Sequence, residues 1–132
     1  MKILILDDDN QRHEIFGKML KGHEVTHARR YRDFFDSVSK ERSDLVYLDY
    51  DLDIASPNPS VYRTAAGRTV AFNGLDAARL LAALPKKHRP SFVIVHSMNP
   101  VRSKDIVRVL DRAKIPHSKI PFSDIYASFA TA

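Results

Sequence analysis

Two apolar runs of the sequence are each followed at once by acidic side chains. KILIL is followed by Asp7 and Asp8, and LVYL is followed by Asp49 and, two positions on, Asp51. Carboxylates gathered in one crevice repel each other and raise each other's pKa unless a cation lies between them. Mg²⁺ and Mn²⁺ prefer oxygen ligands and keep waters that a phosphate can replace. We therefore predict that these four aspartates jointly bind Mg²⁺ or Mn²⁺.

A single aspartate after a strand has a simpler explanation, because it also suits a helix cap or a turn. We interpret Asp9 as a helix cap or a solvated side chain, with Asn10 as a further candidate cap, and Asp53 as part of a loop. The metal prediction thus depends on the joint placement of the acids.

A third apolar run, FVIV, is followed by polar side chains of a different kind. His96 suits general acid or base chemistry, because histidine titrates near neutral pH, although a structural role competes with this interpretation. Ser97 suits hydrogen bonding to a phosphate oxygen better than it suits nucleophilic attack, since no Ser-His-Asp arrangement is evident. Asn99, directly before Pro100, is expected to cap the next helix.

Basic side chains offer a possible phosphate clamp. Arg63 and Arg68 lie in the long segment 53–73, and either could hold a phosphate if that segment closes over the acids as a lid; a solvated role is equally compatible. The clusters at 27–32 and 86–89 are interpreted as solvated. An RNA-contacting surface is the alternative there, with too few interleaved aromatic residues to argue base stacking.

Short apolar runs alternate with amphipathic segments along the chain, which predicts parallel strands joined by helices. At this length the pattern favours a flavodoxin-like α/β fold, a three-layer sandwich around a five-stranded parallel sheet in the order 2-1-3-4-5. The third strand is followed by the insertion 53–73, in which VYRT and RTVAF can pair as a hairpin. We expect strands near 2–6, 24–27, 44–49, 91–97 and 115–120, and helices near 11–20, 30–40, 75–84, 101–113 and 124–130.

The strand order also predicts where a site forms. Ligands of open parallel sheets bind beyond the carboxyl ends of the strands, where the order reverses. The first, third and fourth strands end there, so their acids, His96 and Ser97 are expected to line one crevice.

Composition restricts the class of protein. The 132 residues suit one domain, 1–132, with 44% hydrophobic and 28% charged residues. The chain has no cysteine, which excludes disulfides and thiol chemistry, and no apolar run long enough to cross a membrane. We expect a cytoplasmic protein. The net charge of +5 favours anionic partners in general.

Specific motifs resemble a known family. LILDDDNQRHEIF resembles the opening of response-regulator receiver domains, and DLVYLD resembles their phosphate-accepting strand. The resemblance implies that Asp7 and Asp8 bind Mg²⁺, that Asp49 accepts a phosphoryl group and that Ser97 contacts its oxygens. The receiver lysine would be Lys119, although Ile120 stands where receivers usually have proline.

Other motifs narrow the resemblance. LDDD, the D-x-D-L of DYDL, FNGLDAARLL and VHSMNP together resemble cyclic-phosphate processing receiver domains. This implies a stand-alone domain that processes or binds phosphate esters, such as cyclic phosphates of nucleotides or RNA ends. Asp49, Asp51, His96, Ser97 and Lys119 would carry the chemistry.

Two alternatives remain open. In the first, Asp49 accepts a phosphoryl group from a phosphohistidine kinase and the domain signals to another protein. In the second, the domain keeps the fold as a binding module without chemistry. Mg²⁺ or Mn²⁺ binding separates the second alternative from the others.

Overall fold

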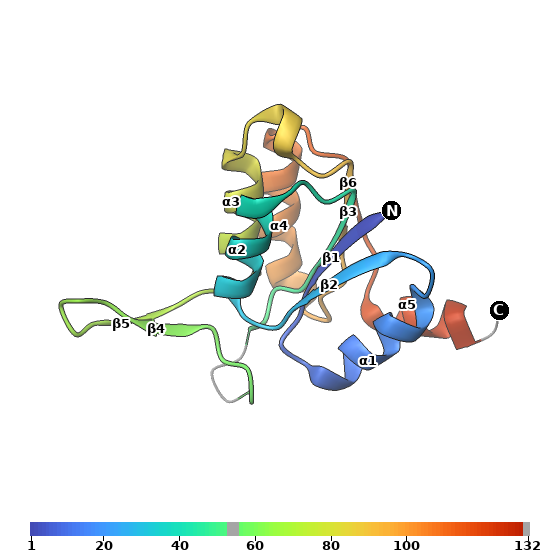
Figure 1. Ribbon diagram of the computed structural model, residues 1–132, viewed down its shortest axis with the longest axis horizontal. Helices are drawn as coiled ribbons and strands as arrows, with labels where there is room; N and C mark the ends of the chain where they lie inside the picture. Colours follow the sequence, from blue (N-terminus) through green and yellow to red (C-terminus); the bar gives the residue numbers. More distant parts are fainter. Residues whose placement is uncertain (53–55, 131–132) are drawn as a thin grey trace.

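A five-stranded parallel sheet forms the centre of the computed structural model, which describes residues 1–52 and 56–130 (Figure 1). The strand order is β2-β1-β3-β6-β7, which confirms the predicted flavodoxin-like order 2-1-3-4-5. The strands are β1 (Lys2–Leu6), β2 (Glu24–Ala28), β3 (Leu45–Leu48), β6 (Phe92–Val95) and β7 (His117–Lys119).

The register aligns the strand ends that matter for the site. Leu6 of β1 pairs with Leu48 of β3, and Leu48 pairs with Val95 of β6. The residues that directly follow these three strands are Asp7, Asp49 and His96, and they therefore lie side by side at one edge of the sheet.

Helices cover both faces of the sheet (Figure 1). One face packs against α2 (Tyr31–Lys40), α3 (Gly74–Ala83) and α4 (Pro100–Arg112), and the other packs against α1 (Asn10–Met19) and α5 (Phe122–Ala130). A short 3-10 helix, η1 (Lys86–His88), follows α3. The predicted three-layer sandwich is thus confirmed.

The core is divided between the two faces because side chains alternate along a strand. Leu4 and Leu6 of β1 contribute to the larger cluster with Phe34, whereas Ile3 and Ile5 contribute to the smaller one with the α1 and α5 rings. Burial of each such side chain contributes roughly 1.5–3 kcal/mol.

Helix caps follow the sequence with one correction. Asp9 caps α1 by accepting a hydrogen bond from the Arg12 amide, so Asn10 is the first residue of the helix and the proposed Asn10 cap was wrong. Asn99 caps α4 as predicted, with Pro100 at the first helical position. Asn73 forms a capping box with Asp76 at the start of α3.

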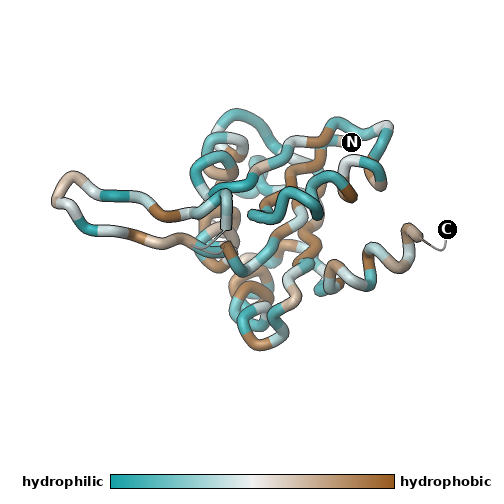
Figure 2. The backbone as a smooth tube through the Cα atoms, turned by 90° about the horizontal axis from the view of Figure 1, so that it is seen from below, coloured by the Kyte–Doolittle hydropathy of each residue, from teal (hydrophilic) through white to brown (hydrophobic). Residues whose placement is uncertain are grey.

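The insertion after β3 contains the predicted hairpin. β4 (Val61–Arg63) and β5 (Thr69–Ala71) pair antiparallel, and the turn contains Gly67 with φ +82°. The hairpin projects from the body of the domain in both views (Figures 1 and 2). Asp53 lies outside the described residues. Within the described ranges, none of the helices has the length and apolar character needed to cross a membrane.

Candidate functional site

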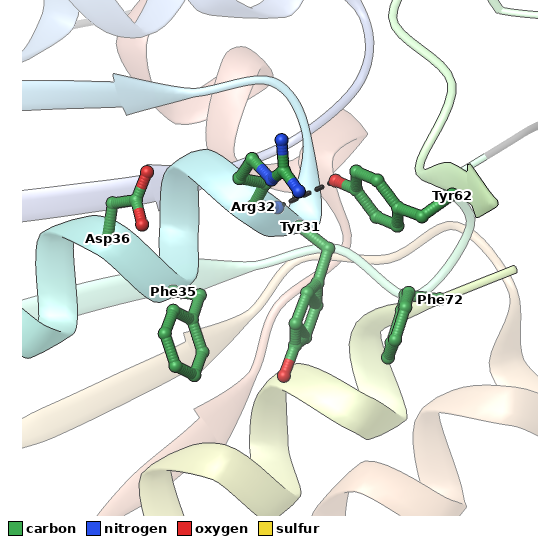
Figure 3. Close-up of a pocket in the computed structure, with 6 residues that line it drawn as sticks. All are labelled: Tyr31, Arg32, Phe35, Asp36, Tyr62 and Phe72. Atoms are coloured by element: carbon green, nitrogen blue, oxygen red, sulfur yellow. Dashed lines mark hydrogen bonds between the residues drawn. The ribbon is translucent and has the colours of Figure 1, made fainter. Parts of the chain in front are cut away.

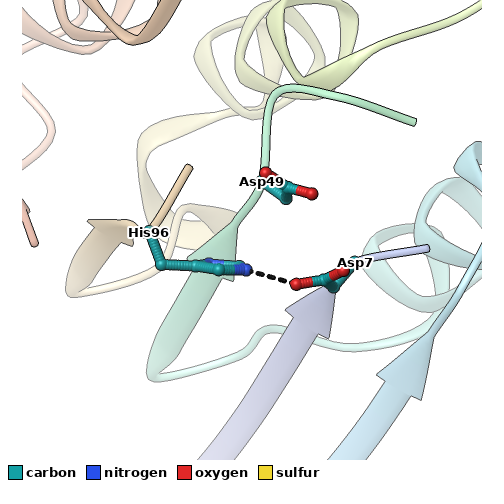
Figure 4. A group of neighbouring side chains, drawn as sticks. All are labelled: Asp7, Asp49 and His96. Atoms are coloured by element: carbon teal, nitrogen blue, oxygen red, sulfur yellow. Dashed lines mark hydrogen bonds and ion pairs between the residues drawn. The ribbon is translucent and has the colours of Figure 1, made fainter. Parts of the chain in front are cut away.

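Three buried side chains converge at the aligned strand ends (Figure 4). Asp7, Asp49 and His96 are 0%, 4% and 1% exposed. Each offers one potential ligand atom, and these atoms lie within 4.8 Å of one another. Nε2 of His96 donates a 2.8 Å hydrogen bond to Oδ2 of Asp7. The predicted meeting of the first, third and fourth strand ends therefore holds for these three residues, which lie together and buried at one edge of the sheet.

Arg12 of α1 supplies a cation at the same place. Its Nε and Nη2 atoms donate to Oδ2 and Oδ1 of Asp7 over 2.7 and 2.9 Å, a bidentate pair. Nη2 also reaches Oδ2 of Asp49 at 3.4 Å and lies 3.8 Å from Oδ1 of Asp8. The guanidinium thus partly neutralises the acids whose repulsion we expected a divalent ion alone to relieve.

The two central carboxylates are pushed toward different protonation states. Burial alone would raise the pKa of Asp7, but the hydrogen bonds from His96 and Arg12 outweigh it and lower that pKa to about 2. Burial and the nearby charge of Asp7 raise the pKa of Asp49 well above its ordinary value, against the opposing effect of Arg12. Asp7 is therefore firmly ionised, while the ionised form of Asp49 lacks full compensation.

His96 lies in an apolar setting. Its ring contacts Phe16, Tyr47 and Phe122, with ring centroids 5.3, 6.1 and 6.4 Å away. Because the Asp7 carboxylate accepts from Nε2, a neutral His96 carries its proton there. Nδ1 is buried and has no hydrogen-bond partner in the described part of the chain. The pair with Asp7 therefore fixes the ring's orientation.

Gly74 sets the distance between α3 and the Asp49 backbone. A Cβ atom placed on Gly74 would lie 2.0 Å from the carbonyl oxygen of Asp49 and 2.6 Å from the Cα of Tyr50. The Gly74 amide also donates to the Tyr50 carbonyl over 2.8 Å. A residue without a side chain is therefore needed for α3 to begin beside Asp49.

The other predicted site residues lie at varying positions around this group. Asp8 is buried beside Asp7, whereas Asp51 is exposed and is not among the three side chains with converging ligand atoms. Ser97 is buried, and its hydroxyl accepts from the Asn99 amide over 3.1 Å. Lys119 is exposed at the end of β7, and none of the ion pairs found in the described ranges includes it.

Arg63 and Arg68 lie away from the acids. Both are exposed on the projecting hairpin (Figure 2), and in the described residues neither side chain has a hydrogen bond or ion pair with Asp7 or Asp49. Arg12 is instead the arginine that contacts these acids, and the predicted phosphate clamp by Arg63 or Arg68 stays a prediction.

Sequence reasoning missed two side chains that support the site. Arg12 had a usable signal, because it lies in the first turn of the helix that directly follows the first acidic run. His13 had none, because its role depends on a distant partner. Its Nε2 donates to the Asp7 carbonyl over 2.7 Å, and its Nδ1 lies 2.7 Å from Nδ1 of His27.

The donor set fits a divalent cation. Asp7 and Asp49 offer carboxylate oxygens, which suit Mg²⁺ and Mn²⁺, and His96 offers an imidazole nitrogen, which favours Mn²⁺ over Mg²⁺. The orphaned, buried Nδ1 of His96 shows that the polar interactions of this group are not complete within the described residues. An added cation would compete with Arg12 for Asp7.

A doubly wound sheet with paired acids at the ends of β1 and β3 defines a receiver-like domain. The model of the cyclic-phosphate processing receiver domain family matches residues 2–112. The chain belongs to this family. No curated protein sequence matches the chain.

Solved receiver domains share the fold. A CheY-like receiver domain from Methylobacillus flagellatus is 16% identical, with a TM-score of 0.63, and the match covers 98% of this chain and 95% of that chain. The receiver domain of NtrX from Brucella abortus is 20% identical, with a TM-score of 0.57 and coverage of 98% and 94%.

A longer protein contains a domain of the same fold. A structure of Brucella abortus NtrX in complex with ADP is 21% identical to this chain, with a TM-score of 0.59. The match covers 98% of this chain and 26% of that one, so this chain spans about a quarter of NtrX. At these identities the likeness concerns the fold alone.

Proposed function

We propose that this domain hydrolyses cyclic phosphates of nucleotides or RNA ends in a reaction that requires Mn²⁺ or Mg²⁺. The observation that carries the proposal is the buried group of Asp7, Asp49 and His96, whose ligand atoms lie within 4.8 Å of one another beside the Arg12 guanidinium. The family's description and the donor chemistry support it.

The cation would be held by Asp7 and Asp49, with His96 or Asp8 beside it. When bound, a divalent ion polarises a phosphate ester and lowers the pKa of a coordinated water. The exposed Asp51 would contribute only through its charge at the rim.

The remaining chemistry belongs to side chains of the chain. Hydrolysis adds water to phosphorus, breaks one ring P–O bond, and places a proton on the ribose oxygen that leaves. His96 is oriented by Asp7 through Nε2 and, when protonated on both ring nitrogens, would donate the Nε2 proton to the ribose oxygen as a general acid, in which case Asp8 and not His96 would lie beside the cation. Arg12 would transfer part of its hydrogen bonding from Asp7 to the phosphate anion, because its fork geometry suits both.

The surrounding apolar rings favour this chemistry. Phe16, Tyr47 and Phe122 around His96 exclude water from one side of the imidazole, and charge interactions strengthen when water is excluded. Ser97, near the start of α4, would face the phosphate as a hydrogen-bond donor, while Lys119, Arg63 and Arg68 would take part only after movement.

Purified protein tests the proposal directly. We expect turnover of 2′,3′-cyclic nucleotides in the presence of Mn²⁺, loss of turnover with a chelator, and loss in Asp49→Asn. Asp105→Asn is the matched control, because Asp105 is an α4 residue paired only at the surface with Arg108. Absence of turnover across a broad panel of cyclic phosphates would refute the proposal.

A second candidate function rests on the position of Asp49. It lies at the end of β3, where the family resemblance places a phosphoryl acceptor, and a phosphodonor kinase and an effector protein would then be the partners. Incubation with a small phosphoryl donor and Mg²⁺, followed by mass spectrometry, separates the two functions. A stable gain of one phosphoryl group on Asp49 favours signalling.

A further inference from the structure

A cavity of about 360 Å³ lies between α2 and the projecting hairpin (Figure 3), and Asp7, Asp49 and His96 are not among the residues that line it. This is within the usual size range of small-ligand pockets, roughly 300–1,000 Å³. Six side chains from three separate segments line it, and four of the six are aromatic. The lining residues are Tyr31, Arg32, Phe35, Asp36, Tyr62 and Phe72. We call it the aromatic pocket.

Part of the aromatic pocket has a structural role. The N-cap residue of α2, Arg30, makes no side-chain capping bond, and the hairpin segment supplies the acceptors instead. The Tyr31 amide donates to the Ser60 hydroxyl over 2.9 Å, and the Arg32 amide donates to the Tyr62 hydroxyl over 2.7 Å. These bonds hold the hairpin against α2 and fix the rings before any ligand arrives.

Other features of the aromatic pocket are not needed for that role. Phe35 is 46% exposed and makes no close ring stack, since its centroid lies 6.5 Å from that of Tyr31. The rings of Tyr31 and Phe72 stack with their centroids 4.4 Å apart. The Tyr31 ring lies between Phe72 and Phe35, so its other face is turned toward Phe35 (Figure 3). An exposed aromatic ring beside a cavity that other rings line is a common feature of ligand sites.

The polar side chains at the rim indicate which ligand fits. The Arg32 guanidinium lies 5.4 Å from the centroid of Tyr62, and Asp36 lies one turn further along α2, on the same side of the helix as Arg32 (Figure 3). A guanidinium donates hydrogen bonds and a carboxylate accepts them. A planar heteroaromatic ring with both donors and acceptors on its edge, as in a nucleobase, satisfies the rings and both charged groups together.

One short segment connects the aromatic pocket to the acidic group. Nδ2 of Asn58 donates to the Asp8 carbonyl over 3.1 Å, and Ser60, two residues on, accepts from Tyr31. Two residues of chain span at most ~7 Å. A few nucleotides of extended single strand therefore suffice to reach from the strand ends to the pocket.

Positive charge lies along the same route. Arg29, Arg30 and Arg32 lie where the chain passes from β2 into α2, and Arg29 donates to Asn10 at the start of α1 over 2.8 Å. Arginines attract a phosphate backbone without regard to its sequence. The cluster 27–32 that we interpreted as solvated thus gains in the fold further aromatic neighbours beside its own Tyr31.

We propose that the aromatic pocket binds a base of single-stranded RNA whose end reaches the acidic group. The position of the RNA end rests on the proposed function, whereas base binding itself does not. Stacking on exposed rings is tolerant of sequence, so we expect little preference among the bases.

Fluorescence anisotropy with a short labelled oligoadenylate, in the presence of a chelator, measures binding without turnover. A strand of equal length with abasic sites carries the same phosphates and is the matched ligand. We expect the intact strand to bind about ten-fold more tightly than the abasic strand, and Phe35→Ala to remove this difference. Phe35→Leu keeps apolar bulk without a ring, and most of the affinity difference between the intact and the abasic strand should be lost in this variant.

The matched control variant is Phe129→Ala, because Phe129 of α5 is similarly exposed, at 41%, and lies outside the aromatic pocket. It should bind both strands as the wild type does. Equal affinity for the intact and abasic strands would overturn the inference, and would indicate either charge attraction alone or a pocket for a protein side chain.

The two proposals fail in different ways. If base-dependent binding is present but no cyclic phosphate is hydrolysed, the proposed function falls and the aromatic pocket inference stands. If 2′,3′-cyclic mononucleotides are hydrolysed but Phe35→Ala changes no binding, the inference falls and the proposed function stands. Asp49→Asn should retain base-dependent binding, since Asp49 does not line the aromatic pocket.

Discussion

The guanidinium of Arg12 binds both carboxylate oxygens of Asp7, with Nε 2.7 Å from Oδ2 and Nη2 2.9 Å from Oδ1. The same Nη2 lies 3.4 Å from Oδ2 of Asp49. A cation that belongs to the chain therefore occupies the space between the two acids. Any divalent ion that binds these carboxylates has to compete with it.

Removal of this guanidinium should strengthen metal binding. We expect Arg12→Gln to raise the affinity for Mn²⁺ ~10-fold or more, because a positive charge within about 4 Å of two ligand carboxylates is lost. Isothermal titration calorimetry with Mn²⁺ measures the change. An unchanged or weaker affinity would mean that Arg12 organises the acids for the metal instead of competing with it.

The same variant should be less stable in the absence of metal. Asp7 is buried and ionised, so loss of its main partner should lower the free energy of unfolding by ~3 kcal/mol, as measured by urea denaturation. Arg108→Gln is the control, because the Arg108–Asp105 pair is exposed and such pairs contribute about 0–1 kcal/mol.

Another prediction concerns the close approach of α3 to Asp49. Gly74→Ala should lower the free energy of unfolding by ~2 kcal/mol or more, because its Cβ would meet backbone atoms that cannot rotate away. The shift of Asp49 should also weaken Mn²⁺ binding.

Gly17→Ala is the matched control for this substitution. Gly17 lies within α1, and a Cβ there meets nothing within 4 Å, so alanine should raise stability by ~0.5–1 kcal/mol through helix propensity. Chemical denaturation of both variants measures the contrast. Equal effects at the two positions would show that the contact with Asp49 is unimportant.

Much of the fold could be predicted because its signals are local. The runs KILIL, LVYL and FVIV are apolar apart from Lys2 at the first position, as expected of strands covered on both faces, and Asn73 and Asn99 mark helix starts by their own capping bonds. Given the strand order, the meeting of Asp7, Asp49 and His96 followed from topology alone.

The rest depended on contacts between distant segments. That Arg12 points at Asp7, that Asp51 faces solvent, and that Tyr62 of the hairpin caps α2 are outcomes of packing, which no periodicity encodes. The aromatic pocket is the clearest case, because its rings come from α2, β4 and the residue after β5. Each of these segments alone has too few aromatic residues to suggest a site.

A further prediction follows from the pair of His13 and His27, in which His13 contacts the Asp7 carbonyl. Burial lowers the pKa of His13 to about 4, against the opposing effect of the hydrogen bond that Nε2 donates to the Asp7 carbonyl. Only one proton is available between the Nδ1 atoms of His13 and His27, which also disfavours a charged His13. A pKa that is lower in the folded state gives stability that is present above the unfolded pKa, ~6.5, and lost as the pH falls toward 4. We expect the free energy of unfolding to fall across this range.

Urea denaturation at several pH values measures this slope. His13→Gln should have a smaller slope between pH ~6.5 and 4, whereas His88→Gln should keep the wild-type slope, because His88 is exposed in η1. A His13 variant with the wild-type slope would assign the acid sensitivity to other groups.

The last prediction is that Asp49 lowers the free energy of unfolding at neutral pH, although the proposed function needs this residue. Its pKa is raised by burial and by Asp7, so the folded state binds this proton more tightly than the unfolded state does. Such a group gives full stability below its unfolded pKa, ~3.9, and that stability is lost as the pH rises through the folded pKa. At neutral pH the ionised Asp49 therefore opposes folding, and Asp49→Asn should raise the free energy of unfolding in a chelator while it abolishes Mn²⁺ binding and turnover. The gain in stability should vanish near pH 3, where the wild-type carboxyl is protonated in both the folded and the unfolded state. The control Asp105→Asn, at the surface, should change the free energy of unfolding and the free energy of Mn²⁺ binding by no more than ~0.5 kcal/mol. A loss of stability in Asp49→Asn at neutral pH would show that Arg12 compensates Asp49 fully and that the site is not held under strain for a cation.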